Sequence, residues 1–162
     1  AAVVTTGAVR LIVGVVALAF FLRWLTQKLA ASERPAPHNR LKATFWGALS
    51  GFTSFLAHAG GPPYQVYALA LKQAPALYVG TSVIYFAIVN AVKLVPYFAL
   101  GQFDTANLAA SAVLMPVAPL ATLAGAWLVR RIRPELFYPF MYTMVMLVGL
   151  KLVWDGVFEL LG

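Results

Sequence analysis

The sequence consists mainly of long apolar runs separated by short charged or polar segments. A transmembrane helix needs about 20 predominantly apolar residues. Some runs are shorter than this, but they approach the required length if a Lys or Arg near one end is included in the helix with its charged group reaching the membrane surface. Continuous apolar runs also differ from the ten-residue alternation typical of membrane β-barrels. The pattern predicts an all-α integral membrane protein with about four transmembrane helices and one broken helical hairpin. Stretches without Asp, Glu, Lys or Arg cover residues 11–22, 43–71, 73–92, 105–129 and 136–150.

The second run is interrupted in its interior by Gly60-Gly61-Pro62-Pro63. Glycine lowers helix propensity, and consecutive prolines lack N–H donors and clash with the preceding turn. We therefore expect one arm near residues 43–59 and a second arm near residues 62–71. The second arm would rise only ~15 Å, which is half of the hydrocarbon layer. This segment is predicted to be re-entrant, and the alternative is a broken helix that still crosses the membrane.

Basic residues cluster in two loops, at residues 28–42 and 130–133. Lys and Arg are enriched in cytoplasmic loops, so both loops are expected on the cytoplasmic side of a multi-pass protein. Three full crossings between the loops would place them on opposite sides, whereas a re-entrant segment at 43–72 places them on the same side. Arg10 is the one base that conflicts with this topology. The remaining helices are expected at about 76–100, 105–129 and 136–156.

Composition supports the membrane assignment and narrows the chemistry. Of the 162 residues, 62% are hydrophobic and 10% are charged, against about 25% charged residues in soluble domains. The net charge of +7 is accounted for by loops that orient the chain in the bilayer, so no nucleic-acid partner is expected. No Cys, two His and five acidic residues leave little material for thiol, metal or paired-carboxylate chemistry. We predict no enzyme activity, no metal and no cofactor.

The break in the second run is a candidate anion site. Irregular backbone at membrane depth is tolerated where it lines a cavity, and broken transporter helices direct their positive N-terminal ends at anions. The prolines suit the first turn of the second arm, and the glycines permit close approach to the backbone. The alternatives are a glycine hinge used for packing and a neutral packing histidine. The candidates are Gly60, Gly61, Pro62 and Tyr64 for anion binding and His58 for proton relay.

The helix that follows the break supplies four more candidates, Thr81, Ser82, Asn90 and Lys93. At 100° per residue, Ser82 and Lys93 project within ~20° of each other and share one face. Polar groups within a span usually face the bundle interior, where they are available to a substrate. The alternatives are hydroxyls bonded to their own helix carbonyls and a Lys93 that snorkels to the membrane surface.

Several short motifs occur in a fixed order from residue 43 onwards. Phe52-Thr53-Ser54-Phe55 and Ala59-Gly60-Gly61-Pro62 come first, and Gly80-Thr81-Ser82, Asn90-Ala91-Val92-Lys93, Tyr97 and Gly101 follow. This ensemble resembles the second half of the sulfite exporter TauE/SafE family. The resemblance implies a bacterial inner-membrane permease with two homologous halves. With a re-entrant first element each half crosses three times, so we expect the halves to be inverted. Residues 43–162 are then one repeat, and residues 1–42 are the last helix of the preceding repeat with its basic loop. The break of a first half is absent, so we expect either a missing N-terminal part or a short member that pairs with another copy.

The resemblance also implies a function. It predicts a permease for small anions, such as sulfite, a sulfonate or a related organic anion, driven by an ion gradient without a cofactor. The expected partners are the anionic substrate and the lipid bilayer, together with a missing half, a second copy or the subunits of a larger membrane complex. The competing hypothesis is a non-transporting structural or accessory subunit, because a single half cannot provide alternating access between two repeats.

Overall fold

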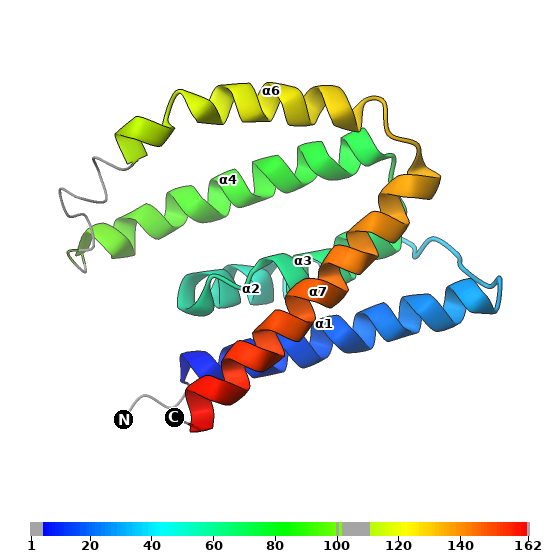
Figure 1. The fold of residues 1–162 in the computed structure, drawn as a ribbon, viewed down its shortest axis with the longest axis horizontal. Helices are drawn as coiled ribbons and strands as arrows, with labels where there is room; N and C mark the ends of the chain where they lie inside the picture. Colours follow the sequence, from blue (N-terminus) through cyan, green and yellow to red (C-terminus); the bar gives the residue numbers. More distant parts are fainter. Residues whose placement is uncertain (1–4, 100, 102–110, 162) are drawn as a thin grey trace. The chain divides into compact units, whose positions relative to one another are not determined.

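The computed structural model of the chain describes residues 5–99, 101 and 111–161 (Figure 1). Within these ranges the regular secondary structure is helical and contains no strand, which confirms the all-α prediction. The chain divides into two compact units, and each is described by itself. One unit comprises Ala1–Gln73 with Glu135–Gly162, and the other comprises Ala74–Pro134.

The first unit contains most of the helices. Its N-terminal helix begins behind Thr5, whose side chain accepts a hydrogen bond from the Ala8 N–H at 3.3 Å. The next helix begins behind Asn39, which accepts from the Lys42 N–H at 3.0 Å. Both are side-chain N-caps of the kind that stabilise helix starts by about 1 kcal/mol. The helices are α1 (Thr6–Leu29), α2 (Arg40–Ala57), α3 (Gly61–Ala68) with the 3-10 turn Leu69–Leu71, and α7 (Pro134–Leu161).

The second unit contains α4 (Pro75–Ala99) and α6 (Val117–Val129). Three helices among the described residues are long and apolar enough to cross a membrane, namely α1, α4 and α7. At 13 residues α6 is shorter than a span. The helix expected over 105–129 falls in part on residues 105–110, which lie outside the described ranges, so the fourth transmembrane helix stays a prediction.

Helices α1 and α7 cross closely because both present glycine at the contact. A Cβ atom on Gly14 would lie 2.8 Å from the Gly149 carbonyl oxygen, and one on Gly156 would lie 2.7 Å from the Leu11 nitrogen. Backbone atoms cannot move aside as a flexible side chain does, so these positions require glycine. Small residues of this kind let membrane helices approach closely and gain packing contacts.

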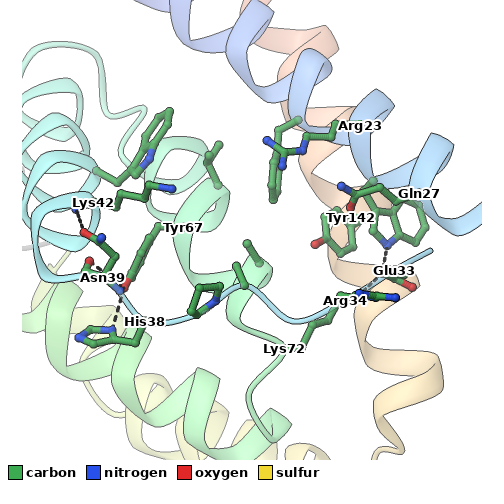
Figure 2. A pocket seen from close by; sticks show the side chains of 17 residues that line it. Arg23, Gln27, Glu33, Arg34, His38, Asn39, Lys42, Tyr67, Lys72 and Tyr142 are labelled. Atoms are coloured by element: carbon green, nitrogen blue, oxygen red, sulfur yellow. Dashed lines mark hydrogen bonds and ion pairs between the residues drawn. The ribbon is translucent and has the colours of Figure 1, made fainter.

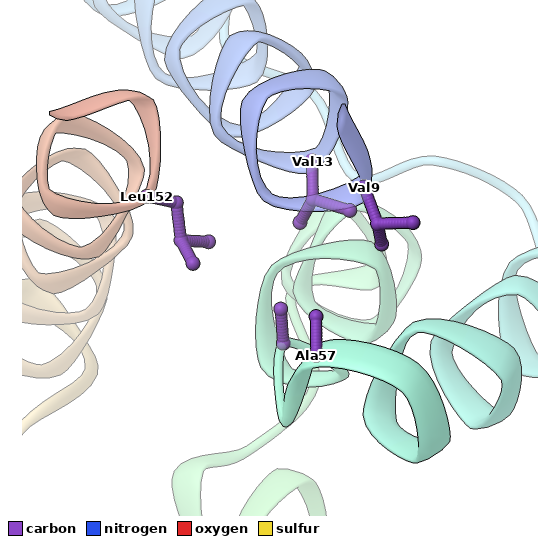
Figure 3. Close-up of a cluster of buried hydrophobic side chains, with 5 residues drawn as sticks. Val9, Val13, Ala57 and Leu152 are labelled. Atoms are coloured by element: carbon purple, nitrogen blue, oxygen red, sulfur yellow. The ribbon is translucent and has the colours of Figure 1, made fainter. Parts of the chain in front are cut away.

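Apolar side chains from three helices pack in the same unit. Figure 3 shows Val9 and Val13 of α1 directed towards Ala57 at the end of α2 and Leu152 of α7, and all four are buried. This cluster, together with Ala59, joins α1 and α7 to the point where α2 ends. The core of the unit therefore lies next to the break between α2 and α3.

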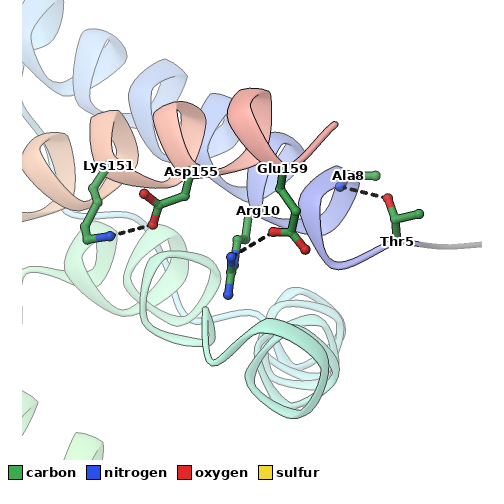
Figure 4. Close-up of polar contacts among 6 residues, drawn as sticks. All are labelled: Thr5, Ala8, Arg10, Lys151, Asp155 and Glu159. Atoms are coloured by element: carbon green, nitrogen blue, oxygen red, sulfur yellow. Dashed lines mark hydrogen bonds and ion pairs between the residues drawn. The ribbon is translucent and has the colours of Figure 1, made fainter. Parts of the chain in front are cut away.

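Arg10, the base that conflicts with the expected topology, has an acidic partner. Its Nη1 donates to Oε2 of Glu159 on α7 at 2.8 Å, as Figure 4 shows. On the same helix Lys151 pairs with Asp155 one turn away at 2.5 Å. Arg10 and Lys151 are therefore each neutralised by a neighbouring acid. Because its charge is paired, Arg10 is weaker evidence against the expected topology than an unpaired base would be.

Candidate functional site

The break predicted at Gly60–Pro63 is present, and polar side chains of α2 hold it. Helix α2 ends at Ala57, and α3 begins at Gly61. Ser50 Oγ donates to the Gly60 carbonyl oxygen at 2.6 Å, and Thr53 Oγ1 lies 3.2 Å from the Ala59 carbonyl oxygen. Ser50 and Thr53 are both buried. The Ser50 hydroxyl thus bonds the Gly60 carbonyl at the break, whereas the Thr53 hydroxyl lies closer to the Leu49 carbonyl of its own helix, at 2.9 Å, than to the Ala59 carbonyl.

The two glycines of the break have different roles. A Cβ on Gly60 would lie 2.6 Å from Ser54 Cβ and 2.7 Å from the Ser50 carbonyl oxygen, so α2 passes too close for any side chain. A Cβ on Gly61 would have no atom within 4 Å. The packing role that we considered for the glycines therefore applies to Gly60. Packing does not explain Gly61, which stays a candidate for close backbone approach by a ligand.

The first turn of α3 has few N–H donors. Pro62 and Pro63 have no N–H, and the Tyr64 N–H donates to the Gly60 carbonyl at 3.4 Å. The Gly61 N–H takes no part in the hydrogen bonds found among the described residues. The carbonyls of the break are thus bonded while a donor at the helix N-terminus is available, an arrangement that favours an anion.

The remaining candidates near the break are less enclosed. Pro62 is buried and Tyr64 is half-buried. His58 is exposed and ends α2 in a left-handed conformation with φ 53°. Its backbone thus provides the turn into the break, and its role as a proton relay stays a prediction.

The candidates on α4 belong to the second unit. Ser82 Oγ donates to the Tyr78 carbonyl oxygen at 2.7 Å, so its hydroxyl bonds back to its own helix. Thr81 and Asn90 are exposed. Lys93 is only 8% exposed, and this burial is unusual for a lysine within an apolar helix. The predicted face shared by Ser82 and Lys93 is thus the less exposed side of α4.

A cavity of about 610 Å³ lies in the first unit, at the end where α1 finishes and α2 begins (Figure 2). Trp24 forms part of its wall, stacks on Tyr142 with ring centroids 4.4 Å apart, and donates from Nε1 to Glu33 at 2.6 Å. Glu33 also pairs with Lys72. The Tyr67 hydroxyl lies 2.7 Å from His38 Nδ1, so two separate groups of polar contacts form parts of the cavity wall.

Our reading of the sequence missed both Ser50 and this cavity. Ser50, Thr53 and Ser54 lie three and four residues apart on an otherwise apolar helix, and that spacing on one face is a signal that was available. The cavity had no comparable signal. Its bases come from the loop at residues 28–42 and neighbouring helix ends, where we attributed the positive charge to membrane orientation.

The comparison with protein families decides the identity of the chain. The family model described as sulfite exporter TauE/SafE matches residues 1–152. The chain belongs to the sulfite exporter TauE/SafE family. This is a family of membrane transporters of sulfite and related anions, which agrees with the apolar helices and a location in a membrane. No curated protein and no solved structure gives a significant match.

Proposed function

We propose that this TauE/SafE protein is a gradient-driven permease for sulfite, a sulfonate or a related small organic anion. The break between α2 and α3 forms part of its anion site. The observation that carries the proposal is the asymmetry of the break, in which the buried Ser50 hydroxyl bonds the Gly60 carbonyl and the Gly61 N–H is left for a ligand. Family membership supports the substrate class.

Such a site binds an anion without a dedicated arginine. A helix N-terminus carries about half a positive charge, and its effect grows where water is excluded. Weak, dipole-based binding suits a permease because the anion must also leave. On α4, the proposal separately retains Thr81, Asn90 and Lys93 as anion-binding residues. Ser82 adds no donor, because its hydroxyl bonds to the Tyr78 carbonyl of the same helix. His58 is proposed to relay a proton. The same proposal places the protein in a bacterial inner membrane, with the loops at residues 28–42 and 130–133 on the cytoplasmic side.

The test is uptake of labelled sulfite and of a labelled sulfonate into vesicles that contain the purified chain. Gly61→Leu should lower the rate at least about tenfold, because the added side chain covers the donor at the helix start. Gly51→Leu on α2 is the matched control, since a Cβ there also has no atom within 4 Å. Its uptake should equal that of the unmodified protein. Asn90→Ala tests the contribution of α4 in the same assay.

Each outcome has a distinct meaning. Unchanged uptake in both Gly61→Leu and Asn90→Ala would overturn the site assignment while leaving the permease assignment intact. Uptake that persists after an ionophore has removed the ion gradient would overturn the coupling. A folded protein that moves neither anion would overturn transport by this chain and favour the accessory-subunit hypothesis.

A further inference from the structure

The cavity of the first unit carries an excess of positive charge. Four Lys or Arg residues and one acid, Glu33, line it, so the lining has a net charge of +3 with His38 neutral. Glu33 pairs with Lys72. The other three bases, Arg23, Arg34 and Lys42, form no ion pair or hydrogen bond through their side chains with any residue that the structure describes. Figure 2 shows these three around the hollow, one each from α1, the connecting segment and α2. The cavity therefore offers three uncompensated cations to a ligand.

The cavity lies at the end of α1, a helix long and apolar enough to cross a membrane. Helix α1 has 24 residues and is ~36 Å long, enough to cross the ~30 Å hydrocarbon layer. Its cavity-lining residues Arg23 and Gln27 lie in its last two turns, and Lys42 lies in the first turn of α2. Trp24, Trp46 and Tyr67, residue types enriched at membrane–water interfaces, also line the cavity. If α1 spans the bilayer, the basic lining lies at the depth of the lipid headgroups.

A separate apolar groove of about 160 Å³ is lined by residues further along the same two helices and by Pro63 of α3. On α1 the cavity begins at Phe20 and the groove ends one turn earlier, at Val16; on α2 the cavity ends at Trp46 and the groove begins at Leu49. The combined lining positions of α1 recur every three or four residues, so they form one continuous stripe. From Phe20 to Val9 this stripe rises ~17 Å, close to the thickness of one hydrocarbon leaflet.

We infer that the cavity binds the phosphate headgroup of an anionic phospholipid and that the groove holds one of its acyl chains. Arginine forks match phosphate oxygens in a bidentate manner, and basic pockets between transmembrane helices bind anionic lipid headgroups. The cavity has the volume of about twenty waters, far more than a four-atom oxyanion fills. A site for a soluble anion does not need an apolar groove beside it, whereas a lipid site does.

The test measures lipid binding rather than transport, so it is independent of the proposed permease activity. The purified chain in a non-ionic detergent is titrated with dioleoyl phosphatidylglycerol in competition with dioleoyl phosphatidylcholine, and bound lipid is counted by native mass spectrometry. The expected result is preferential retention of phosphatidylglycerol. Arg23→Gln and Lys42→Gln should each weaken the affinity for phosphatidylglycerol about fivefold. This factor corresponds to the loss of one base near an anionic headgroup.

Arg40→Gln is the matched control, because Arg40 shares the first turn of α2 with Lys42 and does not line the cavity. Its affinity should stay within twofold of the unmodified chain. Ile12→Phe places a larger side chain in the groove at a position that is 62% exposed, and it should weaken phosphatidylglycerol binding without changing the headgroup preference. Glycerol phosphate, which has the headgroup chemistry without acyl chains, should compete poorly.

Equal binding of the two lipids would overturn the inference, and so would an equal loss in Arg40→Gln, since either result means unspecific attraction to charge. Competition by glycerol phosphate at the same concentration as phosphatidylglycerol would overturn the lipid assignment and identify a soluble phosphate ester as the ligand. Arg23 and Lys42 are both exposed, so each variant gives an independent reading in a folded chain.

Discussion

Replacing Gly60 with alanine tests the packing of the break directly. The new Cβ would lie 2.6 Å from Ser54 Cβ and 2.7 Å from the Ser50 carbonyl oxygen. Carbon atoms in good contact are about 3.5–4.0 Å apart, so α2 and the break must separate by about 1 Å. Neither contact is the far end of a flexible side chain, and the strain therefore falls on the backbone.

The expected cost has two parts. Overpacking of a well-packed interior costs about 1–3 kcal/mol. Separation also weakens the 2.6 Å hydrogen bond from Ser50 to Gly60, which is worth about 0.5–1.5 kcal/mol. We expect Gly60→Ala to lower the free energy of unfolding by about 2–4 kcal/mol. Gly61→Ala adds a Cβ with no atom within 4 Å and should be neutral or stabilise the start of α3 by up to about 1 kcal/mol.

The assay is unfolding of the purified chain in mixed micelles by increasing SDS, followed by far-UV circular dichroism. The two neighbouring variants are compared under identical conditions. Any effect of SDS on the unfolded state therefore cancels in the difference between their free energies of unfolding. Ser54→Gly combined with Gly60→Ala removes the closest contact but leaves the Ser50 carbonyl, and it should recover part of the loss. If Gly60→Ala and Gly61→Ala differ by less than about 0.5 kcal/mol, the scale of ordinary surface substitutions, the packing argument is refuted.

Two further predictions concern the helix crossing and the topology. Gly156→Ala should lower the free energy of unfolding by about 1–3 kcal/mol, because its Cβ would lie 2.7 Å from the Leu11 nitrogen. Gly125→Ala is the control, because a Cβ there has no atom within 4 Å, and its stability should be unchanged. Equal stabilities of the two variants would contradict the close crossing. Because the chain has no native cysteine, Ala74→Cys and Arg133→Cys can each be labelled in cells with an impermeant maleimide. Both should react from the same side of the membrane, and reaction from opposite sides would exclude a re-entrant segment.

The break was predictable because its cause is local. Two prolines without N–H groups, preceded by two glycines, interrupt a helix whatever surrounds them. The distinction between Gly60 and Gly61 was not predictable in this way. It depends on how closely Ser50 and Ser54 approach from α2, and that distance is set by tertiary packing. The same residue type therefore has two roles at adjacent positions, and only the structure separates them.

The cavity was hidden for a different reason. A base in a loop next to an apolar helix is adequately explained by the cytoplasmic enrichment of Lys and Arg. The pattern therefore gave no cause to look for a ligand. What changes the interpretation is convergence in space. Arg23, Arg34 and Lys42 come from three successive segments and surround one hollow whose one acid, Glu33, is paired with Lys72. Spacing along the chain does not express this relationship.

The crossing of α1 and α7 bears on the predicted relation between the two halves. Gly7 and Gly14 are seven residues apart, as are Gly149 and Gly156. A Cβ on Gly14 would meet the Gly149 carbonyl, and one on Gly156 would meet the Gly7 carbonyl. The first glycine of each helix thus faces the second glycine of the other, which is the reciprocal contact of a two-fold axis. We predicted that α1 and α7 are the last helices of two inverted repeats, and equivalent helices of inverted repeats run antiparallel. Any antiparallel pair of helices with equally spaced glycines makes this reciprocal contact. It therefore explains why the two helices pack closely, and the relation between the two halves stays a prediction.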